Sequence, residues 1–327
     1  MSWTSYYRGD GEPRSVPLAP PPPWRTFSPG HAPRAFLPPE GLTDAVNAAL
    51  YLHRPLLITG NTGTGKSTVI EQVAAELTLG PVLRWHITSR STLPDALYRY
   101  DALGHIHALR LQQTSTGGGN GRHGRISRLA RRSGGPDIAP FLQFGPLGTA
   151  LLPGDRPRAL LIDEIDKSDI DLPADLLDVL ESGRFEIPEL VRRPRRDIRV
   201  REWDGPATHP VPSGQVQCTT FPFIVMTSNG DRELPAPFLR RCIRYDMPTP
   251  TAETLRRAVE SHLGPAAAAP GPAGELVTAF AERLARGDSL AVDQLLNAVR
   301  LVIDPQAPTG DQRRRLLDLM LRDLSGA

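Results

Sequence analysis

The feature that most constrains the fold is a glycine-rich loop that joins an apolar stretch to a helical pattern within residues 55–70. The apolar stretch Leu56–Ile58 leads into the sequence GNTGTGKST (60–68), and the apolar residues that follow recur at helical spacing. Glycines let successive backbone N–H groups converge on phosphate oxygens, and the N-terminus of the following helix adds its positive dipole end. Strand, loop and helix in this order predict a nucleotide site.

The positions of the loop have different expected roles. In the pattern GxxxxGK[ST], Lys66 is expected to contact the β and γ phosphates, and the Ser67 hydroxyl is expected to be a ligand of Mg²⁺. The chain contains only two lysines, Lys66 and Lys167, so a chain that otherwise uses arginine keeps a compact point charge in the loop. The predicted nucleotide-binding residues are Gly60, Asn61, Thr62, Gly63, Thr64, Gly65, Lys66, Ser67 and Thr68.

The bulk composition fits two domains or one large one, because the chain has 327 residues, of which 39% are hydrophobic and 23% charged. A net charge of +2 gives no reason to expect a partner that is attracted by charge alone. The cysteines, Cys218 and Cys242, lack metal-ligand spacing, which favours free thiols in a reducing cytoplasm. The N-terminus has no signal-peptide core and no apolar run approaches about 18 residues, so we expect a cytoplasmic protein without a membrane partner.

Two further apolar stretches end in polar residues. Residues 159–165 (ALLIDEI) deliver the carboxylates of Asp163 and Glu164 at a strand end, where Asp163 is expected to hold Mg²⁺ and Glu164 to orient and deprotonate an attacking water. Residues 221–229 (FPFIVMTSN) end in Asn229. Its amide suits the γ-phosphate or the attacking water, and the alternative is a strand-capping role in a turn with Gly230.

The rest of the chain divides by composition. Residues 1–40 are rich in proline and predict an extended arm, which either packs near the nucleotide base or forms a flexible tail. Residues 41–250 form the predicted core, whose first helix (41–52) is expected to be capped by Thr43 or Asp44. After residue 250 the apolar spacing is helical only, so residues 251–327 predict a small helical domain.

Two insertions interrupt the predicted core. The first, at about 104–140, is rich in Gly, Arg, His and Ser and predicts a long, mobile, basic loop. Its arginines could contact nucleic acid, line an axial pore or remain solvated. The second, at about 185–218, alternates in short pieces that suggest one or two hairpins.

With these pieces in order, the chain resembles the AAA+ ATPases and, within them, the MoxR-like branch. The matching segments are GNTGTGKST (60–68), LLIDEID (160–166), MTSN (226–229), LPAPFLRRC (234–242) and a Gly-Pro-apolar step at 145–147. The resemblance covers about residues 40–325. It implies an α/β fold, namely a three-layer αβα P-loop NTPase core with a parallel sheet and a small C-terminal helical lid. It also implies ATP and Mg²⁺ as cofactors and assembly as a homo-oligomeric ring, commonly a hexamer.

The resemblance also assigns roles to residues outside the loop. Asn229 resembles the sensor 1 residue, and Arg241 aligns with the arginine finger that reaches the γ-phosphate of a neighbouring subunit, with Arg240 beside it. Ala291 and Val292 stand where many relatives carry a sensor 2 arginine, so we predict no sensor 2 residue. The basic insertion differs from the compact hairpin insert that is usual in the branch.

The function implied by the resemblance is a Mg²⁺-dependent ATPase that remodels a protein partner, such as a protein with a von Willebrand factor A domain. The Arg- and Pro-rich composition resembles members of bacterial multi-gene, defence-type systems. One alternative is a nucleic-acid-stimulated or GTP-using AAA+ motor of a restriction or defence system. Another is a nucleotide-gated scaffold without hydrolysis. The presence of Asp163, Glu164, Asn229 and Arg241 argues against it. The remodelled substrate, the ring size and the choice between ATP and GTP stay open.

Overall fold

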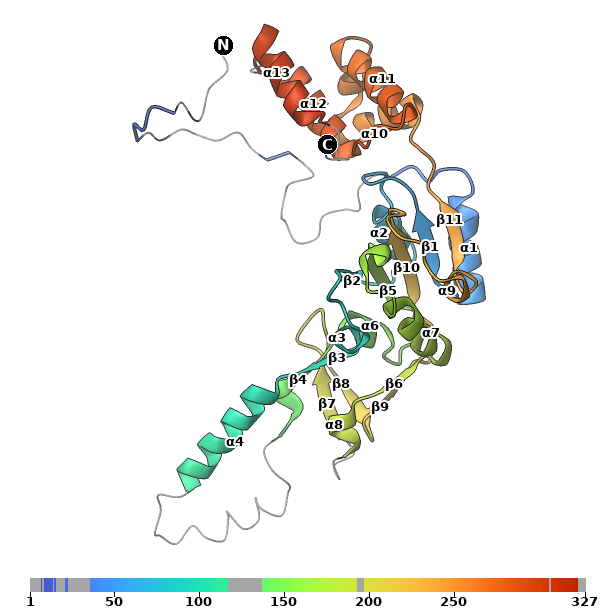
Figure 1. Ribbon diagram of the computed structural model, residues 1–327, viewed down its shortest axis with the longest axis vertical. Coiled ribbons are helices and arrows are strands. Elements are labelled where there is room, and N and C mark those ends of the chain that lie inside the picture. The colour runs from blue at the N-terminus through green and yellow to red at the C-terminus, as the bar shows by residue number, and fades with distance from the viewer. Residues whose placement is uncertain are drawn as a thin grey trace.

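The computed structural model describes residues 36–116, 137–192, 197–305 and 307–322, together with positions 7, 9–13, 15 and 21–22. Within these residues the chain forms a helical lid, a central sheet with its helices, and a second body made from the insertions, arranged along the long axis (Figure 1). Most of the predicted proline-rich arm and the middle of the predicted basic loop (117–136) lie outside the described residues.

The central sheet has five parallel strands in the order β11-β1-β10-β5-β2. The strands are β1 (Leu56–Thr59), β2 (Leu83–His86), β5 (Ala159–Asp163), β10 (Phe223–Ser228) and β11 (Ile243–Asp246). Because the strands run the same way, their carboxyl ends meet at one edge. β1, β10 and β5 are direct neighbours, so the three apolar stretches singled out in the sequence deliver their polar ends to one place.

Alternate side chains of the three central strands, β1, β5 and β10, enter two different cores, which explains the continuous apolar runs of the sequence. Leu56 and Ile58 pack with α1 (Leu42–Leu52) and α2 (Thr68–Glu76) on one face of the sheet. Leu57 packs on the other face. The helices on that face are α3 (Leu93–Leu97), α6 (Pro146–Ala150), α7 (Leu172–Ser182) and α9 (Ala236–Leu239). The predicted three-layer αβα core is confirmed.

Two helix ends show where local rules succeed and fail. The prediction of Thr43 or Asp44 as the cap of α1 is wrong, because the N-cap is Gly41 in the left-handed region (φ 78°) without a side-chain hydrogen bond. A glycine adopts that conformation without a Cβ clash, so the chain can turn sharply into the helix. The end of α7 follows the usual local rule, because its C-cap is Gly183 in the left-handed region (φ 61°).

The two insertions form a single body. β3 (Tyr98–Tyr100), β4 (Leu142–Phe144), β7 (Asp197–Arg201) and β8 (Thr208–Pro212) make a four-stranded sheet in the order β3-β4-β7-β8. β7 and β8 form the predicted hairpin. A smaller antiparallel pair joins β6 (Arg184–Glu186) to β9 (Gln215–Gln217), with α8 (Pro188–Val191) between them in sequence. We call this body the insertion module.

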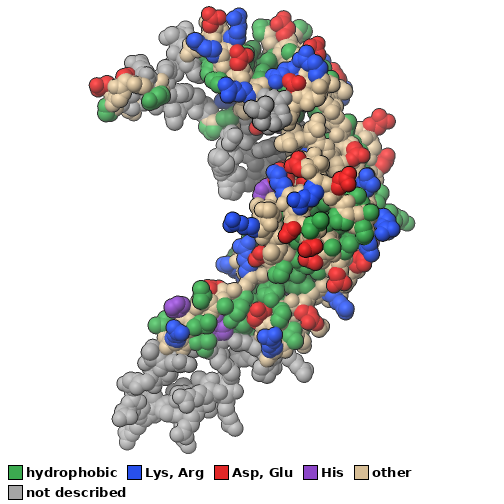
Figure 2. Space-filling view, viewed as in Figure 1, with side chains coloured by type: hydrophobic (Ala, Val, Ile, Leu, Met, Phe, Trp, Pro, Cys, Tyr) green, Lys and Arg blue, Asp and Glu red, His purple; other side chains and the backbone are tan. Residues whose placement is uncertain are grey.

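One part of the first insertion was predicted wrongly. Residues 104–116, expected to be loop, belong to α4 (Ala102–Thr116), which projects from the insertion module (Figure 1). The helix begins where the Asp101 carboxylate accepts the backbone N–H of Gly104 (2.8 Å), and it is anchored by His105, which stacks on Phe141 with a 5.0 Å centroid separation. Asp101 directly before Ala102 was a local sign of this helix start, which the Gly, Arg, His and Ser composition obscured, whereas the packing partner Phe141 lies on another element. Exposed apolar side chains run along α4 (Figure 2).

The C-terminal region is helical, as predicted. It consists of α10 (Ala252–Leu263), the 3-10 turn η4 (Pro265–Ala268), α11 (Pro272–Ala285), α12 (Val292–Ile303) and α13 (Gly310–Met320). Val259, Phe280 and Leu295 lie in its own apolar core and are at most 1% exposed. Acidic and basic side chains are interspersed over its outer surface (Figure 2). Across the described ranges, no helix combines the length and apolarity that crossing a bilayer requires.

Candidate functional site

The site forms where β1, β10 and β5 end. The register pairs Thr59 of β1 with Ser228 of β10, and Met226 of β10 with Ile162 of β5. Consequently the glycine-rich loop after β1, the Asn229 turn after β10 and the acidic pair at the end of β5 are neighbours. The structure therefore brings together all the predicted residues of these three segments.

Glycine is required in the loop for conformation and for space. Gly60, Gly63 and Gly65 have φ values of 139°, 75° and 88°, which L side chains rarely adopt. A Cβ on Gly60 would lie 2.9 Å from the Met247 carbonyl oxygen, and one on Gly65 would lie 3.0 Å from the ring of Phe36. Met247 and Phe36 thus pack closely against the loop backbone, and a side chain at either glycine would push them apart.

Lys66 is only 7% exposed and its ammonium group has three partners. Nζ donates to the carbonyl oxygens of Gly60 (2.6 Å) and Asn61 (2.8 Å) and to Asn229 Oδ1 (2.8 Å). Burial lowers the pKa of Lys66 from its ordinary value, while the charge of the nearby Asp166 acts in the opposite direction. The lysine predicted to bind phosphate is therefore tied directly to the predicted sensor amide.

The two predicted magnesium ligands touch each other. Ser67 Oγ donates to Asp163 Oδ1 (2.8 Å), and Thr227 Oγ1 donates to the same oxygen (2.6 Å). A hydroxyl beside a carboxylate is an oxygen donor set that suits Mg²⁺, which keeps several of its own waters. Among the described residues no group of three or more His, Cys, Asp or Glu side chains is arranged as a cage for a metal. Ser67 and Asp163 fit a metal held largely through water.

Glu164 has an unusual backbone conformation. Its φ and ψ are 61° and 51°, in the left-handed region that is costly for residues other than glycine, and its N–H donates to Thr227 Oγ1 (2.9 Å). The turn aims its carboxylate at Asn229 Nδ2 (Oε1, 3.3 Å) and at Lys167 Nζ (Oε2, 2.8 Å). His86 at the end of β2 lies 3.8 Å away, measured from Nε2 to Oε2.

Several contacting residues were not predicted from the sequence. Lys167 pairs with Glu164, and this hydrogen bond raises the pKa of the lysine. The scarcity of lysine was the one indication available, because both lysines of the chain lie in this site. Thr227 lies two positions before Asn229 in the matching segment 226–229, but nothing in the sequence indicated that it would bond to Asp163.

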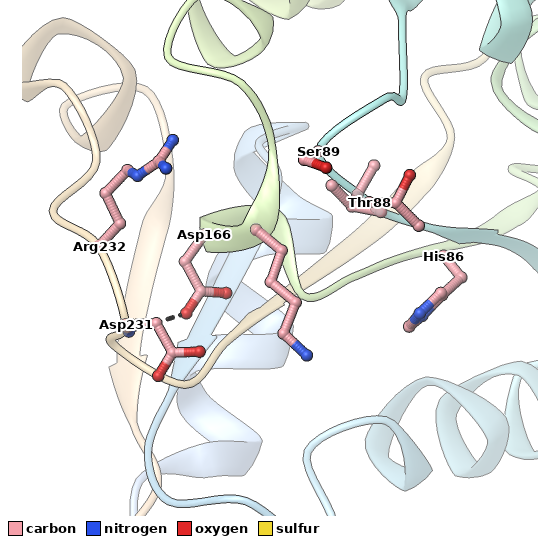
Figure 3. A pocket seen from close by; sticks show the side chains of 8 residues that line it. His86, Thr88, Ser89, Asp166, Asp231 and Arg232 are labelled. Carbon is pink, nitrogen blue, oxygen red and sulfur yellow. Dashed lines mark hydrogen bonds between the residues drawn. The ribbon is translucent and has the colours of Figure 1, made fainter.

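Asp166 connects two turns of the site. It is 2% exposed, and its Oδ2 accepts the backbone N–H groups of Asn229 and Asp231, each at 3.0 Å. It lines a pocket of about 450 Å³ beside Glu164. The pocket is lined by His86, Ile87, Thr88, Ser89, Asp166, Lys167, Asp231 and Arg232. In Figure 3 the side chains of Asp166 and Asp231 lie close together, whereas Arg232 points away from them.

The predicted arginine finger does not join its own chain's site. The Arg241 guanidinium pairs with Glu181 of α7 and donates to the Pro237 carbonyl oxygen (3.0 Å). The Arg240 side chain is exposed, and its carbonyl oxygen accepts a hydrogen bond from Arg54 (3.1 Å). Both arginines lie just after α9, so neither contacts the phosphate loop.

The lid touches the tip of the loop. The backbone N–H of Val292 donates to the Gly63 carbonyl oxygen (3.4 Å), and a Cβ on Gly63 would lie 2.4 Å from Cβ of Ala291. The small side chain of Ala291 permits this approach. Val292, at the position where many relatives carry a sensor 2 arginine, therefore contacts the phosphate loop through its backbone.

The comparisons with known proteins agree with this geometry. The model of a family described as "AAA domain (dynein-related subfamily)" matches residues 55–242, more than half of the chain. The match includes the glycine-rich loop, the acidic pair, Asn229 and Arg241. Among curated proteins, none matches the chain. The nucleotide loop, the acidic strand end and the matched family together show that this chain belongs to the dynein-related subfamily of AAA domains and is a P-loop NTPase.

Proposed function

We propose that the protein is a Mg²⁺-dependent ATPase of the AAA+ class. The observation that carries this proposal is the hydrogen bonding that links the three segments of the site. Lys66 reaches Asn229, and Asn229 reaches Glu164. Ser67 donates a hydrogen bond to Asp163, which also accepts one from Thr227. Phosphate-binding, metal-binding and water-activating groups are thus held in one connected arrangement.

The residues divide the reaction between them. Lys66 and the loop N–H groups bind the phosphates, and the two carbonyl bonds of Lys66 are exchanged for phosphate oxygens. Ser67 and Asp163 would hold Mg²⁺, which when bound neutralises charge on the phosphates. Glu164 accepts the proton of the attacking water, and the Asn229 amide, already between Lys66 and Glu164, orients that water. Lys167 holds the Glu164 carboxylate in place.

We extend the proposal to a homo-oligomeric ring in which Arg241 acts on a neighbour. The support is that Arg241 lies outside its own site and is half-exposed, paired with the exposed Glu181. Following the resemblance to the MoxR-like branch, we propose that a hexameric ring remodels a protein partner, such as one with a von Willebrand factor A domain. The location in this proposal is the cytoplasm, whose reducing conditions suit the two free thiols, Cys218 and the buried Cys242.

The test is turnover of ATP and GTP by the purified chain with Mg²⁺, measured beside Glu164→Gln and a control, Glu275→Gln, on the lid. We expect ATP hydrolysis to fall by at least about 100-fold in Glu164→Gln, because the water loses its base, while nucleotide affinity is retained. The control should match the unchanged protein. Turnover that survives in Glu164→Gln contradicts the assignment of the base. If the protein hydrolyses GTP in preference to ATP, GTP is the substrate and this part of the proposal is wrong.

A further inference from the structure

The insertion module has an exposed sheet face with an unusual composition. Along β7, Ile198 (6% exposed) and Val200 (0%) enter the core, whereas Arg199 and Arg201 alternate with them and are exposed. The strand register places Gln143 of β4 opposite Arg201. Gln143 is in turn opposite Arg99 of β3, so all three arginines lie on one face. We call Arg99, Arg199 and Arg201, together with Gln143 of β4 and Thr208 of β8, the arginine face.

The guanidinium groups of this face are held by neutral partners. Arg201 donates to Gln143 Oε1 (2.8 Å), and Arg199 Nε donates to Thr208 Oγ1 (2.9 Å). The Arg99 guanidinium carbon lies 5.1 Å from the centre of the Trp203 ring, within the range of a cation–π contact. Each of these contacts positions an arginine and leaves its charge uncompensated.

The two acidic residues that follow β7 are engaged with another arginine. Glu202 and Asp204 both pair with Arg158, at 3.5 and 2.6 Å. Within the described residues, none of the three arginines of the face forms an ion pair with a carboxylate within 4.0 Å. The face therefore carries three positive charges that the described structure does not neutralise, although the net charge of the whole chain is only +2.

The form of the face points to a partner with regularly spaced negative charges. Arg199 and Arg201 are two residues apart on one strand, about 7 Å, and Arg99 and Arg201 are two strands apart, about 10 Å. A guanidinium fork binds phosphate through two parallel hydrogen bonds. A folded protein partner normally requires a buried apolar centre in its interface, and the centre of this face is Arg, Gln and Thr. Nucleic-acid interfaces are polar and strongly positive, as this face is.

We propose that the arginine face binds the phosphate backbone of a nucleic acid. This goes beyond the proposed ATPase activity, because binding at the face requires no turnover and uses none of the residues of the nucleotide site. The charges contact phosphates, so the face is expected to bind without strong sequence preference. It also gives the insertion module a binding role of its own.

The experiment is fluorescence anisotropy with labelled single-stranded and duplex DNA of random sequence, measured across a salt series. The variant Arg99→Gln/Arg199→Gln/Arg201→Gln removes the face. The matched control Arg286→Gln/Arg315→Gln/Arg322→Gln removes the same charge from exposed positions in the C-terminal region. We expect the face variant to bind at least about 10-fold more weakly. The slope of log K against log salt should fall by about two for single strands, since each lost phosphate contact accounts for about 0.7. The control should keep the slope of the unchanged protein.

Three results would overturn the proposal. The first is a face variant that binds as tightly and with the same salt slope as the control. The second is an unchanged protein that does not bind DNA at low salt. The third is polyglutamate of matched charge displacing DNA as well as unlabelled DNA does, which would assign the face to an acidic protein segment. Thermal melting of both triple variants checks that they are folded. Because ATP turnover is not used as a readout, failure of this proposal is distinguishable from failure of the proposed ATPase function.

Discussion

At the scale of single residues, Asp166 determines where the predicted sensor amide lies. Its carboxylate accepts the N–H of Asn229, and Asn229 contacts both Lys66 and Glu164. Asp231 lies on the same pocket and adds a charge that acts on Lys66, but its side chain is exposed. Both carboxylates act on Lys66 through their charge, but the two backbone hydrogen bonds belong to Asp166. Substituting each residue in turn therefore distinguishes loss of a charge from loss of these hydrogen bonds.

We predict that Asp166→Ala lowers kcat by at least about 10-fold while the Kd for nucleotide changes by less than about threefold. Losing hydrogen bonds to a charged acceptor costs about 1.5–3 kcal/mol each, and 1.4 kcal/mol corresponds to a factor of ten. Hydrogen exchange should speed up at the amides of residues 229–231. The control Asp231→Asn should stay within about twofold in kcat. If kcat falls equally in Asp166→Ala and Asp231→Asn, the loss is due to the missing negative charge and not to the backbone hydrogen bonds.

The residues of the site differ in how far the sequence predicted them. Lys66, Ser67, Asp163 and Glu164 follow local patterns, since a strand end and a loop fix where such side chains point. His86 and Lys167 enter because β2 neighbours β5 and because a 3-10 turn follows Glu164, and no local periodicity encodes that strand order or that turn. The arginines 240 and 241 remain predictions, because their expected partner is another subunit.

At the scale of elements, β3 and α8 join the two insertions. The Tyr98 hydroxyl donates to Glu189 Oε2 (2.9 Å). Burial, together with this hydrogen bond, raises the pKa of Tyr98 from 10.0 to about 12. The sequence indicated hairpins in the second insertion by their alternation. It did not indicate that Gln143 and Arg201, 58 positions apart, would pair, because such register depends on the assembled core.

We predict that Tyr98→Phe lowers the free energy of unfolding by about 0.5–1.5 kcal/mol at neutral pH, the usual net value of one hydrogen bond. The folded state holds the Tyr98 proton more tightly than the unfolded state does. Its contribution is therefore full below pH 10 and is lost as the pH rises to about 12. Urea midpoints of the unchanged protein and of Tyr98→Phe should converge over this range. Tyr51→Phe, at an 85% exposed position, is the control. A gap that stays constant from pH 7 to 12 would contradict the role of the hydroxyl.

At the scale of the whole molecule, the ring proposal makes a prediction about mixtures. Glu164→Gln removes the base of a subunit but keeps its Arg241, and Arg241→Ala does the reverse. Each variant alone should be inactive. In an equal mixture, half of the sites have Glu164, and half of those face a neighbour with Arg241, so about a quarter of the activity should return.

The measurement is ATP turnover after subunit exchange, with light scattering in the presence of ATP to give the mass of the assembly. The control mixes Glu164→Gln with the double variant Glu164→Gln/Arg241→Ala, in which no site is complete. If the mixture of single variants stays inactive while the unchanged protein is active and assembled, Arg241 does not act across a subunit boundary.

The contact between Gly63 and Ala291 has a thermodynamic consequence. Because the lid rests on the loop that binds phosphate, a ligand that shifts the loop changes the equilibrium of the lid, and linkage makes the coupling reciprocal. A shift of the lid from one position to another must therefore change nucleotide affinity by the same factor by which bound nucleotide changes the equilibrium constant between those two positions. Nucleotide binding at the glycine-rich loop and the position of the four lid helices are thus coupled in both directions through this contact.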